Sequence, residues 1–221
     1  MKQKLLCTLC IGLFTASSFA VVELYEEPPV GDAYVDSVQT NTNFNTETLQ
    51  IQGFGAETPP FGPDLVSIQQ SYLKFDVSSL AGKTIQSAVF GVYLLNDSDY
   101  ETPSLQLNYV GDDSWTETGI TWANKPSSIE MIGTPELTDT IDRYYEWNVF
   151  DTWHGDENSD GFVTYMLNVN QQDVDNYAYF ASRENTAYQP FLRIEYIPEP
   201  ATMLLLGLGV SLVRKQRTAR Q

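Results

Sequence analysis

The feature that most constrains the fold is a pair of alternating stretches, separated by a turn, between residues 70 and 95. In the first stretch every second residue from Leu73 to Val77 is apolar, and more polar residues lie between them. Residues 78–82 are small turn formers, and a second alternating stretch follows. A period of two is typical of a strand with one buried face. Two such strands need a second sheet against their apolar faces, which predicts an antiparallel β-sandwich.

Further short alternating segments occur along the chain, with glycine, proline and asparagine between them. We predict additional strands around residues 31–38, 49–51, 105–109, 145–149, 161–169, 177–182 and 191–196. The segment 126–140 is predicted to be irregular. Roughly nine or ten short strands with long connections favour an all-β fold, an antiparallel jelly-roll sandwich. We expect this single domain to cover residues 21–197.

Residues 1–20 are typical of a secretory signal peptide. Two lysines precede a short apolar run, residues 5–14, and small residues lead to a predicted cleavage after Ala20. A membrane anchor is the alternative, but the run is too short to span a bilayer as a helix. Both cysteines lie inside this signal helix, so the exported chain would contain no disulfide.

The C-terminal segment, residues 198–221, has the features of a second address. Pro198, Glu199 and Pro200 precede an apolar run, residues 201–213, and a basic cluster. This order resembles the PEP-CTERM sorting tail, which implies recognition by the membrane protease exosortase. Thirteen helical residues reach about 20 Å, short of the ~30 Å hydrocarbon core, and the basic cluster would stay cytoplasmic. We expect transient association of this hydrophobic helix with the inner membrane; an ordinary single-span anchor is the alternative.

The segment between the two addresses is strongly acidic. Residues 21–197 contain six Lys and Arg residues against 28 Asp and Glu residues, a net charge of −22. Such a surface repels nucleic acid and anionic lipid. It is compatible with solubility outside the cell and with cation binding.

Three motifs carry a family resemblance: Y-L-K-F-D-V-S-S-L-A-G-K-T-I-Q-S-A at residues 72–88, D-D-S-W-T-E…I-T-W-A-N-K-P at 112–126, and F-A-S-R-E-N…P-F-L-R-I-E-Y at 180–196. In this order they resemble the DNRLRE domain, also classed as carbohydrate-binding module family 96, over residues 31–196. The resemblance implies a non-catalytic carbohydrate-binding sandwich. Members of the family are associated with alginate, and a domain with a net charge of −22 suits a polyanion only if calcium bridges the two.

The resemblance directs attention to side chains that could hold a sugar, namely exposed aromatic rings and the few cations. Three tryptophans, Trp115, Trp122 and Trp147, lie in segments predicted to be core. Tyr144 and Tyr188 are further candidates for stacking platforms, and Arg183 has the alternative of an ion pair with its neighbour. The predicted carbohydrate-binding residues are Tyr72, Lys74, Arg143 and Arg183.

Residues 156–161, D-E-N-S-D-G, match the opening of a calcium loop, in which alternate oxygen ligands surround the ion and glycine permits a tight turn. Leu167 stands where an EF-hand has its bidentate glutamate, so the segment is not an EF-hand. The alternative is an acidic turn that joins two strands. The predicted calcium ligands are Asp156, Asn158, Asp160, the carbonyl of Phe162, and Thr164.

Catalytic signals are weak in this chain. A Ser-His-Asp triad would need His154, the single histidine, which lies in a predicted loop, and no carboxylate pair stands out. We therefore predict that the protein is not an enzyme. The predicted function is an exported protein of the Gram-negative cell surface or biofilm matrix that reaches its place through the Sec machinery and binds extracellular polysaccharide, with calcium as its cofactor. Two alternatives remain: a purely structural matrix protein and a polysaccharide-degrading enzyme.

Overall fold

The structure is a computed structural model that describes residues 22–46, 48–53, 67–97, 105–133, 141–152, 160–169 and 177–198. Regular structure in these residues is β, apart from two single-turn 3-10 helices at Ser78–Leu80 and Phe150–Thr152. No helix in this part of the chain has the length and apolar character needed to cross a bilayer. The strands are β1 Glu23–Glu27, β2 Gly31–Asp36, β3 Thr48–Gln52, β4 Gln69–Asp76, β5 Thr84–Asp97, β6 Leu105–Val110, β7 Glu130–Gly133, β8 Arg143–Asn148, β9 Phe162–Val169, β10 Tyr177–Ala181 and β11 Phe191–Ile197.

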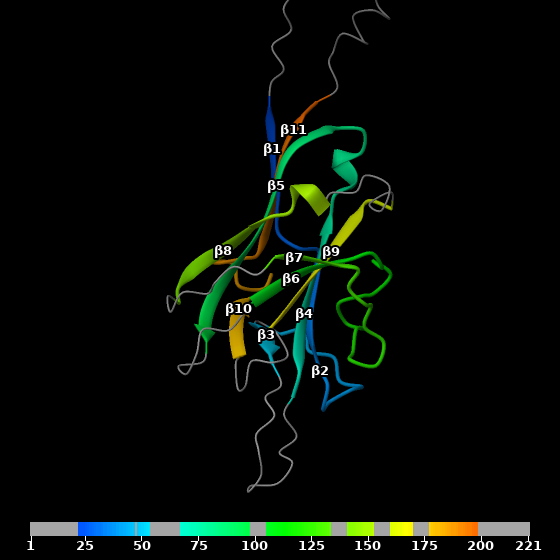
Figure 1. The fold of residues 1–221 in the computed structure, drawn as a ribbon, viewed down its shortest axis with the longest axis vertical. Coiled ribbons are helices and arrows are strands. Elements are labelled where there is room, and N and C mark those ends of the chain that lie inside the picture. Colours follow the sequence, from blue (N-terminus) through cyan, green and yellow to red (C-terminus); the bar gives the residue numbers. More distant parts are fainter. Residues whose placement is uncertain are drawn as a thin grey trace, which may run out of the picture.

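All strand pairs are antiparallel and belong to one curled sheet (Figure 1). The main path runs β1-β11-β5-β10-β3-β4-β9-β6-β7, with β2 added to β4 and β8 added to β5. The long strand β5 pairs with β11 along its first half and with β10 near its end. Strands β10 and β3 thus connect a half built on β5 to a half built on β4.

The two halves of the sheet face each other across a common apolar core. Phe75 of β4 lies edge-on to Phe90 of β5 at 6.0 Å between ring centroids, although β3 and β10 separate these strands in the sheet order. Tyr165 of β9 is 5.2 Å from Phe90, and Trp147 of β8 is 5.7 Å from it. Contacts between strands that are not sheet neighbours require the sheet to fold over on itself, and this packing supplies the hydrophobic stabilisation.

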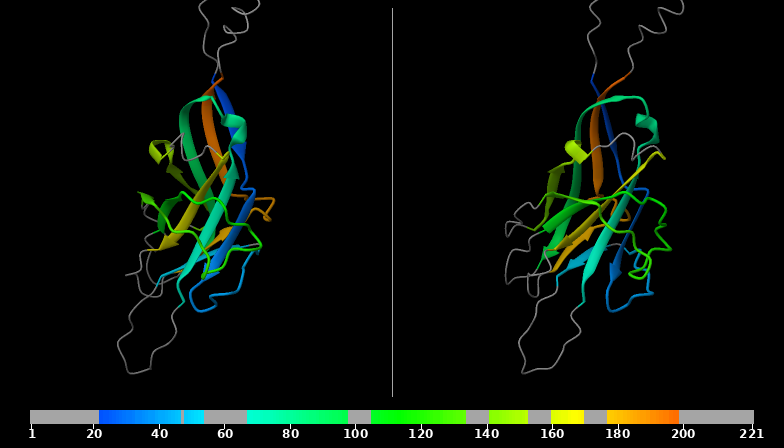
Figure 2. Two further views of the ribbon diagram at one scale, coloured as in Figure 1. Left: turned by 90° about the vertical axis from the view of Figure 1, so that its right-hand side faces the viewer. Right: turned by 45° about the vertical axis from the view of Figure 1, so that its right-hand side comes forward.

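A second, smaller apolar cluster lies on the outer face of β2, β4, β6 and β9. It forms beneath the segment 111–129, which runs beside these strands (Figure 2). Trp115 is at its centre, edge-on to Tyr72 at 6.1 Å, and Trp122 packs at its margin. The expectation that β4 has a polar, solvent-facing side is therefore wrong in its middle, because the covering segment buries that side as well.

The sequence located most of the strands. The all-β antiparallel fold is confirmed, as is the core position of Trp115 and Trp147, whereas the jelly-roll strand order stays a prediction. Residues 126–140 were expected to be irregular, which is wrong for β7 because it pairs with β6. Strand β1 was not expected from its sequence, ELYEE, because Tyr25 is the one residue in it that is half-buried. The predicted flanking helices lie outside the described residues.

Strand β1 pairs with β11 in a register that places Glu23 opposite Tyr196. The first and last described strands therefore lie side by side, and both ends of the described chain leave the same end of the domain (Figure 1). Whatever precedes residue 22 and follows residue 198 is attached at this one end.

A candidate ligand-binding corner around Arg183

A hollow of about 510 Å³ lies between the β1–β2 connection and the turn that follows β4. Such a volume is within the range of small-molecule sites. Its wall combines one tyrosine ring, two serines, acidic side chains and a single cation, which is a set suited to hydroxyl-rich ligands. The lining residues are Tyr25, Glu27, Pro28, Pro29, Val30, Asp76, Ser78, Ser79 and Arg183.

The Tyr25 ring is held in place at the wall of this hollow. Its hydroxyl donates a hydrogen bond to the backbone carbonyl of Asp76. Burial, together with the nearby carboxylates of Glu27 and Asp76, raises the pKa of Tyr25 to about 12. The hydroxyl therefore stays protonated and neutral throughout the physiological range.

Arg183 follows β10, and both its side chain and its backbone are held by other residues. Its guanidinium donates to the carbonyl of Val30 and lies 3.5 Å from Glu117 and 3.7 Å from Glu184. Its own carbonyl accepts a hydrogen bond of 2.6 Å from the Gln189 side chain. Arg183 thus presents a positioned positive charge to the hollow, in a domain whose net charge is strongly negative.

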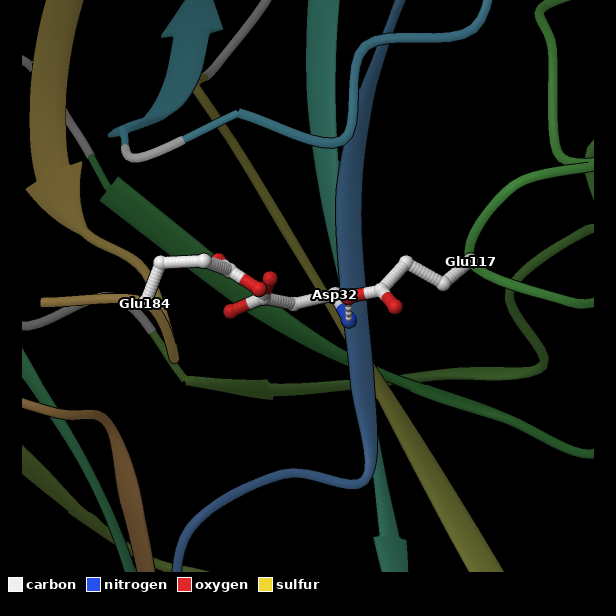
Figure 3. A group of neighbouring side chains, drawn as sticks. All are labelled: Asp32, Glu117 and Glu184. Atoms are coloured by element: carbon white, nitrogen blue, oxygen red, sulfur yellow. Dashed lines mark hydrogen bonds between the residues drawn. The ribbon is translucent and has the colours of Figure 1, made fainter.

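Behind Arg183, three carboxylates from distant parts of the chain converge. Asp32 of β2, Glu117 and Glu184 each offer an oxygen, and these oxygens all lie within 4.8 Å of one another. Figure 3 shows the Glu184 carboxylate facing that of Asp32, while Glu117 approaches from the other side. Asp32 is fully buried, Glu117 is half-buried and Glu184 is exposed, so the group opens to solvent on one side.

Local structure explains each position in this carboxylate group. Glu117 lies in the tight turn after Trp115, and the Asn43 amide fixes this turn by donating to the carbonyls of Glu117 and Ile120, both at 2.7 Å. The backbone N–H of Asp32 donates to Glu117 at 3.2 Å. Glu184 lies in the turn after β10, where its carboxylate accepts a hydrogen bond of 2.8 Å from Ser182.

The electrostatics of Asp32 are unusual. One carboxylate oxygen accepts a hydrogen bond of 2.8 Å from the backbone N–H of Arg183, and the other is buried without a hydrogen-bond partner. The pKa of Asp32 is raised to about 8, chiefly by burial; the charges of Glu184 and Glu117 also raise it, while the N–H and the charge of Arg183 lower it. A carboxylate at this position lacks compensation for its charge.

Two of the predicted sugar-binding residues are not at an accessible surface. Tyr72 is 0% exposed and its hydroxyl donates to the Pro126 carbonyl at 3.0 Å, so its interpretation as a stacking platform is wrong. The Lys74 ammonium lies beneath the segment 111–129, where it donates to the carbonyls of Asp113, at 3.0 Å, and Trp115. The physical reason is the same for both: the face of β4 that was expected to meet solvent is covered.

The other predicted residues do not line the hollow, and Tyr144 and Tyr188 lie together against the Tyr93 ring. Arg143 begins β8, and its guanidinium lies 4.8 Å from the Tyr145 ring. Tyr188 is 42% exposed and stacks on Tyr93 at 4.0 Å between ring centroids. Tyr144 lies 5.1 Å from the same Tyr93 ring. Of the predicted set, Arg183 alone lines the hollow.

The predicted calcium loop is only partly within the described residues, since Asp156 and Asn158 lie outside them, as does His154, the histidine that a catalytic triad would need. Asp160 accepts a hydrogen bond of 3.1 Å from the Phe162 N–H, as in a short acidic turn, and β9 begins at Phe162. Thr164 is fully buried within β9, where its hydroxyl donates to Asp113 and accepts a 3.1 Å bond from the Trp115 indole. This placement gives the Thr164 hydroxyl two partners in the segment 111–129, and the loop itself stays a prediction.

The predicted processing signals also fall largely outside the described residues. Pro198 is the last described residue, and Ala20, Glu199 and Pro200 lie beyond the described range.

Sequence reasoning missed the carboxylate group of Asp32, Glu117 and Glu184. Glu117 and Glu184 both lie in the family motifs, and Asp32 directly precedes Ala33 in β2. The available signal was an acidic residue beside the apolar residues of a predicted strand, since a buried aspartate is rare unless it is paired or bound.

The fold is an antiparallel β-domain of two facing layers with a polar hollow at its edge, an architecture shared by lectin domains, cupins and viral capsid proteins. Residues 24–196 match carbohydrate-binding module family 96, so the chain belongs to this family. Residues 197–217 match the PEP-CTERM protein-sorting motif, which indicates export and sorting by exosortase.

A more distant similarity links the chain to a curated protein named gellan lyase, from a Bacillus species. The two are 27% identical over 198 residues, an alignment that covers 84% of this chain and 7% of the lyase. The chain therefore spans a small fraction of that protein's length.

Proposed function

We propose that this protein is exported, processed by exosortase, and retained at the cell surface or in the extracellular matrix, where it binds a polysaccharide without cleaving it. The observation that carries the proposal is the family match, which spans residues 24–196 and thus every described strand. The sorting motif that follows at residues 197–217 supports the location.

The hollow beside Arg183 is the binding site that the geometry supports best. Tyr25 offers part of an aromatic face, and the serine hydroxyls and Arg183 offer hydrogen bonds. The guanidinium can also pair with a carboxylate on an acidic sugar. Strand β1 begins at the end from which both ends of the described chain leave, and it runs from there to the β1–β2 connection at the wall of the hollow.

One observation favours a second candidate function. The relative named gellan lyase suggests a polysaccharide-degrading enzyme, but the alignment covers only 7% of it. A purely structural matrix protein is the other alternative. Both differ from the proposal in a measurable way, since one predicts cleavage products and the other predicts no binding.

A glycan array probed with the purified protein, with and without calcium, tests the proposal. Alginate and gellan belong on the array, together with neutral polysaccharides. Arg183→Ala and Tyr25→Ala should each weaken binding about tenfold or more, because each removes a wall of the hollow. Arg143→Ala is the matched control, since it removes the same charge at a position away from the hollow.

The outcomes separate the candidates. Binding that depends on Arg183 and leaves the polysaccharide chain length unchanged supports the proposal. Release of new chain ends shows an enzyme, and absence of binding to every polysaccharide shows a structural protein. Binding that depends on Tyr188 instead of Arg183 moves the site to the stacked tyrosines.

A further inference from the structure

The unpartnered oxygen of Asp32 is the most unusual polar atom at this corner. Asp32 is 0% exposed, and its second carboxylate oxygen has no hydrogen-bond partner. A buried carboxylate oxygen that is left unpaired destabilises the folded state. The Asp32 carboxylate faces the Glu184 carboxylate, with Glu117 adjacent (Figure 3). The surrounding carboxylates favour a positively charged ligand at this point.

The charges at this corner do not balance. Three carboxylates meet within 4.8 Å, and the Arg183 guanidinium is the cation that contacts two of them. The sum is a net charge of −2 when Asp32 is ionised, and −1 while its raised pKa keeps it protonated. Like charges at such distances repel, and in a partly buried place water screens that repulsion weakly.

We propose that Asp32, Glu117 and Glu184 bind a divalent cation, and that this cation is calcium. The unpartnered oxygen of Asp32 supplies the buried ligand, and one oxygen each from Glu117 and Glu184 supplies the others. Water and the exposed side of the site complete the coordination shell. The proposal is independent of sugar binding, and it places calcium away from the loop at residues 156–161.

The ligand chemistry selects calcium among the common metals. All three side chains offer hard oxygen ligands, and histidine and cysteine are absent from the group, which disfavours zinc and copper. The ligands come from a strand and two turns, so their arrangement is not a rigid octahedron, and calcium tolerates irregular geometry better than magnesium does.

The cation also has a structural consequence. Asp32 belongs to β2, Glu117 to the segment that covers the outer face, and Glu184 to the turn between β10 and β11. One ion would therefore link three parts of the chain that are distant in sequence. It would add stability to a domain that, between residues 21 and 197, has no cysteine.

Calorimetric titration and thermal melting of the purified protein, after treatment with EDTA, test the proposal. We expect one site per chain at this corner with a Kd of about 0.1–1 mM, the range of extracellular calcium modules. Calcium at about 10 mM should then raise Tm by about 3–10 °C. Magnesium at the same concentration should produce a smaller rise.

Variants locate the ion. Asp32→Asn should weaken calcium binding at least about 100-fold and abolish the rise in Tm. In the absence of calcium its Tm should be unchanged or higher, because a buried charge has been removed. Glu184→Gln, at an exposed position, should weaken binding about tenfold and keeps the test valid if Asp32→Asn fails to fold.

Two controls match these variants. Asp36→Asn changes another buried aspartate of the same strand, whose carboxylate is fully hydrogen-bonded, and should leave the calcium-induced rise in Tm unchanged. Asp160→Asn changes the alternative loop and should also leave it unchanged. The proposal is overturned if the unmodified protein does not respond to calcium, if Asp32→Asn and Glu184→Gln respond normally, or if Asp160→Asn alone abolishes the response. If the unmodified protein does not respond to calcium, the three carboxylates are held together by a shared proton and not by a metal ion.

Discussion

Lys74 offers a sharp test of the two-sided burial of β4. The sequence predicts that its ammonium meets a sugar, whereas the structure places it beneath the segment 111–129. There it donates to the carbonyls of Asp113 and Trp115 and lies 4.8 Å from the Trp115 ring centroid. Lys74→Met keeps the length of the side chain and removes the charge and all of these interactions.

The structure sets the expected magnitude. A hydrogen bond from a charged donor contributes about 1.5–3 kcal/mol, and a cation–π contact about 0.5–1 kcal/mol where solvent has access. Because Lys74 is half-buried, and methionine recovers part of the apolar contact, we expect Lys74→Met to lower the free energy of unfolding by about 2–4 kcal/mol. The covering segment carries Glu117, so its loosening should also weaken calcium binding about tenfold.

Urea denaturation followed by tryptophan fluorescence measures the first effect, since Trp115 reports on the covering segment. Hydrogen exchange of residues 111–129 shows whether the loss is local. Lys83→Met is the matched control: its ammonium lies 5.9 Å from the Tyr196 ring, and we expect a change within about 0.5 kcal/mol. A change equally small for Lys74→Met, together with reduced sugar binding, would refute the structural role and restore the ligand role.

Three further predictions follow from single contacts. Trp115→Phe keeps an aromatic ring but removes the indole N–H that donates to Thr164 and part of the buried apolar volume, and should cost about 1–3 kcal/mol in urea denaturation; an unchanged midpoint would contradict this. Gly91→Ala places a methyl group against the ring of Phe191 and should cost about 1–3 kcal/mol in the same assay, with a neutral result showing that the ring can move. Burial alone would raise the pKa of Asp36, but hydrogen bonds from Val38, Gln69 and their neighbours outweigh it and lower the pKa. This carboxylate therefore stabilises the fold above its unfolded-state pKa of about 4, and the contribution is lost as pH falls through the lower folded-state value. Asp36→Asn should consequently lose less stability than the unmodified protein between about pH 5 and pH 2, and equal losses would show that the carboxylate is not hydrogen-bonded as described.

Local patterning was sufficient to predict the strands and the fold class. Alternation at Leu73, Phe75 and Val77 correctly assigned these side chains to the main core, because the period of two is a property of the strand itself. Trp147, in an alternating strand, and Trp115, in a family motif, were also correctly assigned to the interior. Family motifs in the sequence added the class of the module and its sorting tail.

What the alternation does not encode is the coverage of the second face. Tyr72 and Lys74 were expected to meet solvent because their strand looked half-buried, and nothing local to β4 shows that residues 111–129 lie over it. The carboxylate group was missed for the same reason: Asp32 and Glu184 are separated by most of the chain, so no local pattern links them. A site built from segments that are far apart in the sequence can be recognised only in the folded structure.

The most direct test of the account is affinity electrophoresis of the purified protein through gels that contain the polysaccharide selected by the array, compared with gels that contain none. The account predicts that polysaccharide retards the unmodified protein and Arg143→Ala, that it retards Arg183→Ala far less, and that the polysaccharide keeps its chain length. Equal retardation of Arg183→Ala, or shortening of the polysaccharide, would contradict the assignment of this corner as a non-catalytic sugar-binding site.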